Sequence, residues 1–184
     1  MTVHKAGSIH GESGFTLIDL LFTCSLIALI STMAVPGLLR ARGVAQSASA
    51  IGTMRVINSA QLSFAVTCGS GFYAPALPTL GVIPPGGVAA FLPSDLSSGA
   101  TFTKQGYSFT MTGTPFAGAP ASCNGLAADA AAPGYAATAD PLDAQGNPRF
   151  FATNADGTIY ENPTTFLGVM PESGPPPIGT ALQK

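Results

Sequence analysis

The feature that most constrains this chain is an uninterrupted apolar run near its N-terminus. Residues 20–39 contain no charged side chain over 20 positions. A helix of that length spans about 30 Å, the thickness of the hydrocarbon core of a bilayer. The sequence therefore predicts a helix able to cross a membrane. Hydropathy alone does not distinguish a plain signal anchor from a segment with a second role.

The residues around the start of this run decide against the two simplest interpretations. In an ordinary signal peptide the small-residue cleavage site follows the apolar stretch, whereas here the small polar residues precede it. In a plain anchor, Asp19 would stand unpaired at the edge of the span, at a cost of a few kcal/mol. A cut between Gly14 and Phe15 would supply a partner cation, the new α-ammonium of Phe15 in the same or a neighbouring copy.

Four separated residues, Gly14, Phe15, Asp19 and Pro36, together with the apolar run, closely resemble the type IV pilins and the pseudopilins of type II secretion. In that family a prepilin peptidase cuts after a leader glycine, and the following Phe is N-methylated. An acidic residue stands fifth in the mature chain and a proline twenty-second. Asp19 departs from the usual Glu by one methylene, and Glu12 lies where basic leader residues are common, with Lys5 as the only leader side-chain cation.

The resemblance implies an α+β fold in which a long N-terminal helix packs against a small antiparallel β-sheet head. It implies a cleaved leader at residues 1–14, a helix at 15–66 and a head domain at 67–184. The helix divides into a transmembrane half, 15–39, and an amphipathic half, 40–66. The head carries an αβ-loop, the sheet and a proline-rich tail. The segments 58–61, 149–162 and Gly81 also look similar to pilin heads.

The function implied is that of a structural subunit that inserts in the inner membrane and polymerises into a pilus or pseudopilus. Phe15 and Asp19 would then form an inter-subunit contact. The expected partners are other copies or related pilins, the prepilin peptidase and an inner-membrane assembly platform. The head would lie on the periplasmic side, and the filament would be periplasmic or extracellular. Major pilin, minor pilin and pseudopilin stay open, as do adhesion, motility, DNA uptake and secretion.

The amphipathic half of the helix carries two apolar stripes instead of one. The inner stripe repeats at spacings of three and four, and consists of Ala50, Met54, Ile57, Ala60 and Phe64. The outer stripe is rotated away from it and consists of Val44, Ile51, Leu62 and Val66. We expect one stripe to cover the head and the other to meet neighbouring subunits; the alternative is one broad stripe buried in a single core. Pro36 and Gly37 predict a kink.

The head reads as about four antiparallel strands. The glycines after Cys68 end the helix, and the proline-rich segment 69–100 is expected to be irregular, with a short turn at 89–92. Alternation predicts a strand at 107–112, and a second is expected at 135–139. A hairpin is predicted at 149–161, turning at Asn154–Gly157. The tail after Asn162 is expected to be a polyproline or coil strap.

Two of the three cysteines, Cys68 and Cys123, would lie on the oxidising side of the membrane and are expected to pair. Closing a loop of about 56 residues restricts the unfolded chain by roughly 4 kcal/mol. Cys24 is expected to be a small, buried apolar residue. No cysteine pair has the spacing of a zinc site.

Catalysis is not predicted. Both histidines lie in the first ten residues, and no nucleophile, zinc-protease or phosphate-loop motif is present. A net charge of −2 with scattered cations indicates no nucleic-acid binding. The acidic loops 140–143 and 154–156 loosely resemble calcium loops of some pseudopilin heads but lack the EF-hand spacing, so no metal or cofactor is predicted.

The alternative from another class is a monomeric, membrane-anchored or secreted, disulfide-linked β domain that binds a ligand. The N-terminus of the mature protein separates the two hypotheses. A chain beginning at N-methylated Phe15 would exclude the plain anchor.

Overall fold

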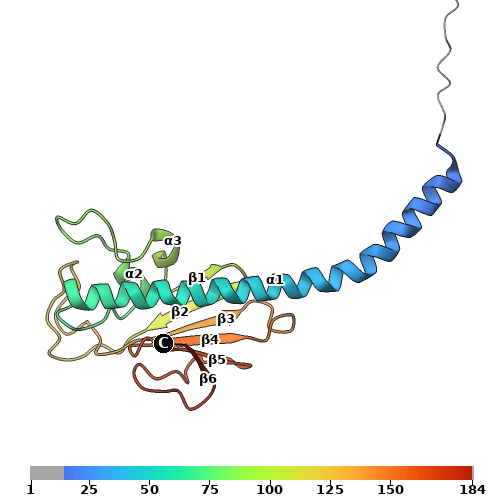
Figure 1. Ribbon diagram of the computed structural model, residues 1–184. Helices are drawn as coiled ribbons and strands as arrows, with labels where there is room; N and C mark the ends of the chain where they lie inside the picture. Colours follow the sequence, from blue (N-terminus) through green and yellow to red (C-terminus); the bar gives the residue numbers. More distant parts are fainter. Residues whose placement is uncertain (1–14, 184) are drawn as a thin grey trace, which may run out of the picture. The chain divides into compact units, whose positions relative to one another are not determined.

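The computed structural model describes residues 15–183, and its contacts divide the chain after Ala41 into two compact units. Helix α1, Leu17–Thr67, contributes to both (Figure 1). Its 51 residues correspond to about 77 Å of helix, close to the predicted range of 15–66. The helix continues through Pro36 and Gly37, so the proline does not interrupt it.

The second unit combines the C-terminal half of α1 with a six-stranded sheet, so the α+β expectation is confirmed. Successive strands pair antiparallel in the order β1-β2-β3-β4-β5-β6, and α1 lies across one face of the sheet (Figure 1). The strands are β1 Thr101–Lys104, β2 Tyr107–Thr112, β3 Ala136–Pro141, β4 Phe150–Asn154, β5 Ile159–Asn162 and β6 Thr180–Gln183.

The core lies between α1 and this face of the sheet. All five residues of the inner stripe are buried. On β2, burial alternates as the sequence does, with Tyr107, Phe109 and Met111 turned inward. The rings of Phe102 and Phe109 stack at 4.8 Å between centroids. One of the two stripes therefore packs the helix onto the head, as predicted, and the structure identifies it as the inner stripe.

The predicted number of strands was wrong, because the sheet has six. The prediction of about four strands missed β1, which is short and joined to β2 by the turn residues Gln105 and Gly106, with φ of +49° and +81°. It also missed β6, which follows the prolines of the tail and pairs with β5. Residues 89–92, where a short turn was predicted, form bends, and the segment 69–100 also contains two short helices that were not predicted, α2 Leu77–Leu80 and α3 Ser94–Ser97.

The tail between β5 and β6 does form the strap expected of it. Residues 163–179 contain no helix or strand. Phe166 and Met170 from this segment pack on Ala136 and Ala152, on the face of the sheet opposite the α1 core. A cavity of about 120 Å³ remains between this strap and strands β2 and β3. Both faces of the sheet are thus covered by other parts of the chain.

Candidate subunit interface

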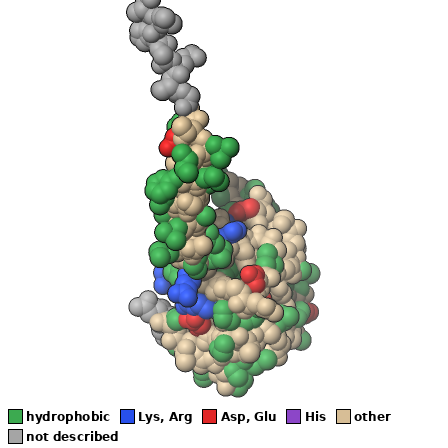
Figure 2. Space-filling view, turned by 90° about the vertical axis from the view of Figure 1, so that its right-hand side faces the viewer, with side chains coloured by type: hydrophobic (Ala, Val, Ile, Leu, Met, Phe, Trp, Pro, Cys, Tyr) green, Lys and Arg blue, Asp and Glu red, His purple; other side chains and the backbone are tan. Residues whose placement is uncertain are grey.

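The first part of α1 is exposed throughout the described residues. Every residue from 15 to 42 is exposed, and Figure 2 shows hydrophobic side chains along this part of the helix. The helix is long and apolar enough to cross a membrane. The hydroxyls in the run donate to helix carbonyls three or four residues back, at Thr23, Ser25, Ser31 and Thr32. Its polar side chains therefore need no outside acceptor.

Asp19 caps the start of the helix. The backbone N–H of Thr16 donates to Asp19 Oδ2 at 3.3 Å, and the Thr16 hydroxyl donates to the same oxygen. In return, the Asp19 N–H donates to Thr16 Oγ1 at 3.4 Å. This reciprocal arrangement is a capping box, with Asp in the place of the usual Glu. The sequence pattern Thr-x-x-Asp was the available signal for it.

The predicted processing site falls partly outside the described residues. Gly14 and the rest of the leader lie beyond them, and Phe15 lies immediately before the capping box with its side chain exposed. Cys24 is an exposed free thiol, so the expectation that it is buried was wrong for the isolated chain. The reason is that this window of α1 is not buried in the part of the chain that the structure describes.

The outer stripe of α1 is exposed along most of its length. Val44 is 64% exposed, Leu62 59% and Val66 75%, while Ile51 is partly buried against the core. A single broad stripe buried in one core is therefore not what the helix forms. Among the described residues, the exposed apolar surfaces of α1 are therefore this stripe and the apolar run before residue 40.

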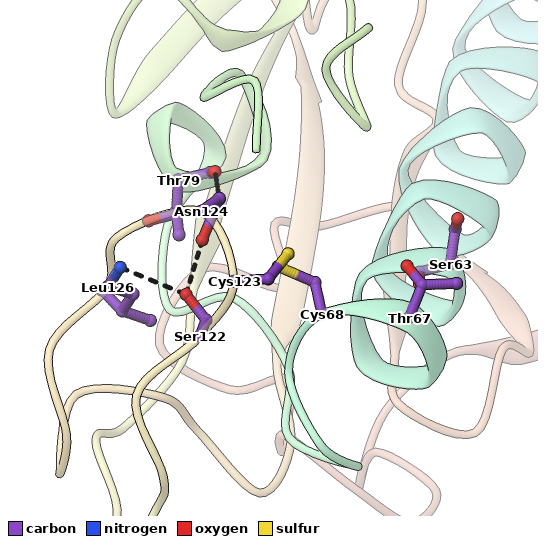
Figure 3. The surroundings of a disulfide bond; sticks show 8 residues. All are labelled: Ser63, Thr67, Cys68, Thr79, Ser122, Cys123, Asn124 and Leu126. Atoms are coloured by element: carbon purple, nitrogen blue, oxygen red, sulfur yellow. Dashed lines mark hydrogen bonds between the residues drawn. A yellow bond between two sulfur atoms is a disulfide. The ribbon is translucent and has the colours of Figure 1, made fainter. Parts of the chain in front are cut away.

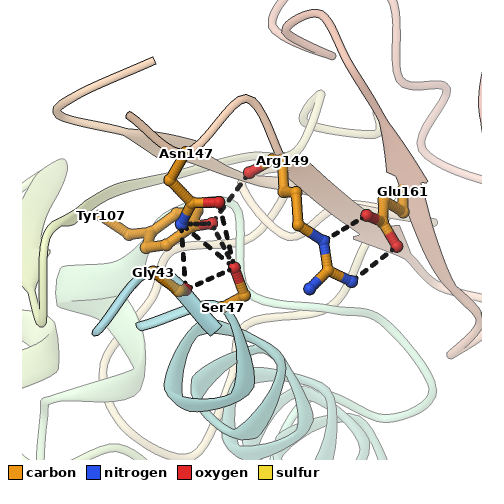
Figure 4. Close-up of polar contacts among 6 residues, drawn as sticks. All are labelled: Gly43, Ser47, Tyr107, Asn147, Arg149 and Glu161. Atoms are coloured by element: carbon orange, nitrogen blue, oxygen red, sulfur yellow. Dashed lines mark hydrogen bonds and ion pairs between the residues drawn. The ribbon is translucent and has the colours of Figure 1, made fainter. Parts of the chain in front are cut away.

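A buried polar cluster holds the helix to the head at the start of the second unit (Figure 4). Asn147 Nδ2 lies 3.2 Å from Gly43 O, 3.1 Å from Ser47 Oγ and 3.0 Å from Tyr107 Oη. The Tyr107 hydroxyl donates to the Arg149 carbonyl at 2.9 Å. Burial raises the pKa of Tyr107, so the hydroxyl stays protonated and able to donate.

Two further polar side chains, near the C-terminal end of α1, hydrogen-bond the helix to the head. Asn58 Nδ2 donates to Thr153 Oγ1 at 2.9 Å, and its Oδ1 accepts from the Tyr135 hydroxyl at 2.8 Å. Gln61 exchanges two 2.9 Å hydrogen bonds with the N–H and carbonyl of Ala74. No role was predicted for Asn58 and Gln61 individually, although polar residues beside the inner stripe were a signal for such contacts.

Arg149, the residue directly before β4, pairs with Glu161 of β5. Arg149 Nη2 donates to Glu161 Oε2 at 3.0 Å, Nε donates to Oε1, and the guanidinium lies 5.4 Å from the centre of the Phe151 ring. The hydrogen bond to Glu161 raises the pKa of Arg149. The bidentate geometry fixes both side chains.

The predicted disulfide is present, and it closes the end of α1 onto the head (Figure 3). Cys68 directly follows the helix, and Cys123 lies in the loop between β2 and β3. Next to it, Asn124 Nδ2 donates to Thr79 O at 2.7 Å and so ties the loop to α2. The disulfide thereby joins the end of α1 to the β2–β3 loop, and the Asn124 hydrogen bond joins that loop to α2.

The aspartates of the acidic loops accept hydrogen bonds from other residues of the head. Asp140 accepts from the Thr165 hydroxyl, Asp143 from the Gly146 N–H at 3.0 Å, and Asp156 from the Gly174 N–H at 2.9 Å. Between residues 15 and 183 no group of three or more potential metal-ligating side chains comes together. These carboxylates serve as turn and strap contacts.

Comparison of the chain with protein-family models, with curated proteins and with solved structures finds no match.

Proposed function

We propose that this protein is a structural subunit, a pilin or pseudopilin, that enters the inner membrane and polymerises into a filament. The observation that carries the proposal is the sequence Gly14-Phe15-Thr16-Leu17-Ile18-Asp19 directly before an apolar, membrane-length helix segment whose residues are exposed in the described part of the chain. The processing motif, the membrane-length segment and the head follow one another as a filament subunit requires.

The extent of the uncovered apolar surface supports assembly. Soluble monomers rarely expose large contiguous apolar patches, and such patches mark membrane or protein contacts. A lipid bilayer accounts for residues 15–39 before assembly. It does not account for Leu62 and Val66, which lie in the second unit beside the buried stripe. Neighbouring subunits would cover both surfaces in a filament.

The proposed life cycle has two stages. The uncut chain is held by its helix in the inner membrane with the head on the periplasmic side, and a prepilin peptidase removes residues 1–14. The mature chain then packs with other copies or related pilins through an assembly platform. The α-ammonium of Phe15 and the carboxylate of Asp19 meet between subunits, replacing the capping box as the partner of the carboxylate.

Mass spectrometry of the membrane fraction and of filaments sheared from cells tests this proposal. We expect a mature chain of 170 residues (184 minus 14) beginning at N-methylated Phe15, and its recovery in the sheared fraction. A Gly14→Val variant should stay full length, whereas Gly11→Val, the matched change elsewhere in the leader, should be cut. A full-length wild-type chain absent from the sheared fraction would favour the anchored monomer instead.

A further inference from the structure

The few charges of this chain are divided unevenly between helix and head. Within residues 15–183 the ion pairs are Lys104–Asp95 and Arg149–Glu161. The other cationic side chains between residues 15 and 183 all lie on α1: Arg40, Arg42 and Arg55. The remaining acids between residues 15 and 183, apart from Asp19, all lie in the head: Asp140 near the end of β3, and Asp129, Asp143, Asp156 and Glu172 in loops.

Arg55 lies within the outer stripe of α1. It follows Ile51 by four residues and precedes Leu62 by seven, so the three share one face of the helix. Arg55 is exposed, and between residues 42 and 67 the helix carries no acidic side chain. Two copies joined through this face would bring cation to cation, which is unfavourable. The outer stripe is therefore complementary to a surface that combines an acid with apolar groups.

One acid of the head meets that description. Of the five, only Asp143 directly follows a large exposed apolar residue, Leu142, which is 65% exposed. The loop is held at both ends, by the Leu142 N–H donating to Gly106 O at 2.9 Å and by Asn147 donating to Gly43 O. Asp143 Oδ1 accepts from Gly146, and Oδ2 is left for another donor.

Building on the proposed function, we infer that the outer stripe of α1 docks against the Leu142–Asp143 loop of a second copy, with Asp143 paired to Arg55. Leu142 packs on the apolar residues of the stripe while the carboxylate meets the guanidinium. The contact joins two different surfaces, so it is heterologous, and repetition generates an open filament instead of a closed dimer.

Cysteine cross-linking of full-length chains in the membrane tests the contact directly. In a Cys24→Ala background, Arg55→Cys combined with Asp143→Cys should give a ladder of disulfide-linked multimers. Each single variant should remain monomeric under the same oxidation. Dimers from Arg55→Cys alone would mean that the helix faces meet each other, and would overturn the inference.

Charge exchange supplies the second readout. We expect Arg55→Glu to lower the sheared-filament yield about tenfold and Asp143→Arg, added to it, to restore most of the loss. Asp129→Arg, the matched exchange at another head acid, should restore nothing. Wild-type filaments that show neither the 55–143 cross-link nor the rescue would overturn this contact alone. Absence of both filaments and cross-links would overturn the proposed function as well.

Discussion

Gln61 is a single residue that links α1 directly to the segment after the helix, at Ala74. Its side chain is fully buried and satisfies both backbone groups of Ala74. We predict that Gln61→Leu destabilises the protein by about 2–4 kcal/mol, because it leaves a buried donor and acceptor without partners. Chemical denaturation of the detergent-solubilised chain measures the difference. Ser59→Ala, two positions away on the exposed side, should change stability by less than about 0.5 kcal/mol.

Asp140 is a residue at which burial works against the charged form. Desolvation raises its pKa above the ordinary 3.8, and the hydrogen bond from Thr165 only partly offsets this. A carboxyl whose pKa is raised by folding binds its proton more tightly in the native state, so stability falls as pH rises through the interval above 3.8. The ionised group therefore costs stability at neutral pH.

We accordingly predict that Asp140→Asn raises the melting temperature at pH 7, since the amide oxygen still accepts from Thr165 without carrying charge. The gain should disappear near pH 3, where the unfolded carboxyl is protonated as well. Thermal scans of both proteins at the two pH values test this. An equal gain at pH 3 would show that the charge is not the cause.

At the scale of elements, the disulfide ties the end of α1 to the β2–β3 loop. Without reductant, alkylation should label one thiol per chain, the exposed Cys24, and reduction should expose two more. Cys68→Ser should destabilise the protein by about 4 kcal/mol, because a loop of this length is no longer closed in the unfolded chain. Cys24→Ser provides the control, with unchanged stability expected. Labelling of Cys123 before reduction would contradict the pairing.

The elements also show what the sequence could and could not predict. The boundaries of β2 matched because Tyr107–Thr112 alternates strictly between buried and open sides. The inner stripe was also predictable from a local pattern, because its apolar residues repeat with the period of a helix. Strand β6 was not predictable, because it depends on pairing with β5 across a proline-rich segment, and no local sequence pattern encodes that pairing. The cluster of Ser47, Tyr107 and Asn147 was missed because its members are distant in sequence.

For the molecule as a whole, the sequence predicted which kinds of surface would be exposed. The apolar run was predicted as a surface for lipid and other subunits, and one of the two stripes as a surface for neighbouring subunits; among the described residues the run and most of the outer stripe are exposed. Only the structure distinguishes the two environments of the stripes, because exposure depends on where the sheet lies. It also reveals that Asp19 already has a local role as a helix cap.

Because Asp19 also belongs to the helix cap, a test of its role in assembly needs a control variant that removes the cap alone. Asp19→Ala removes the carboxylate half of the capping box together with the proposed inter-subunit carboxylate, whereas Thr16→Ala removes the cap hydroxyl and leaves the carboxylate. Loss of a cap costs about 0.5–2 kcal/mol, while breaking a buried ion pair by removing one partner costs about 3–5 kcal/mol. We predict that both variants insert and are cut after Gly14, that Asp19→Ala assembles poorly, and that Thr16→Ala and Asp19→Glu assemble nearly normally. The measurement is sheared-filament yield relative to membrane-inserted protein. Equal losses from Asp19→Ala and Thr16→Ala would assign Asp19 to capping alone, and unchanged yield from Asp19→Ala would remove its proposed role between subunits.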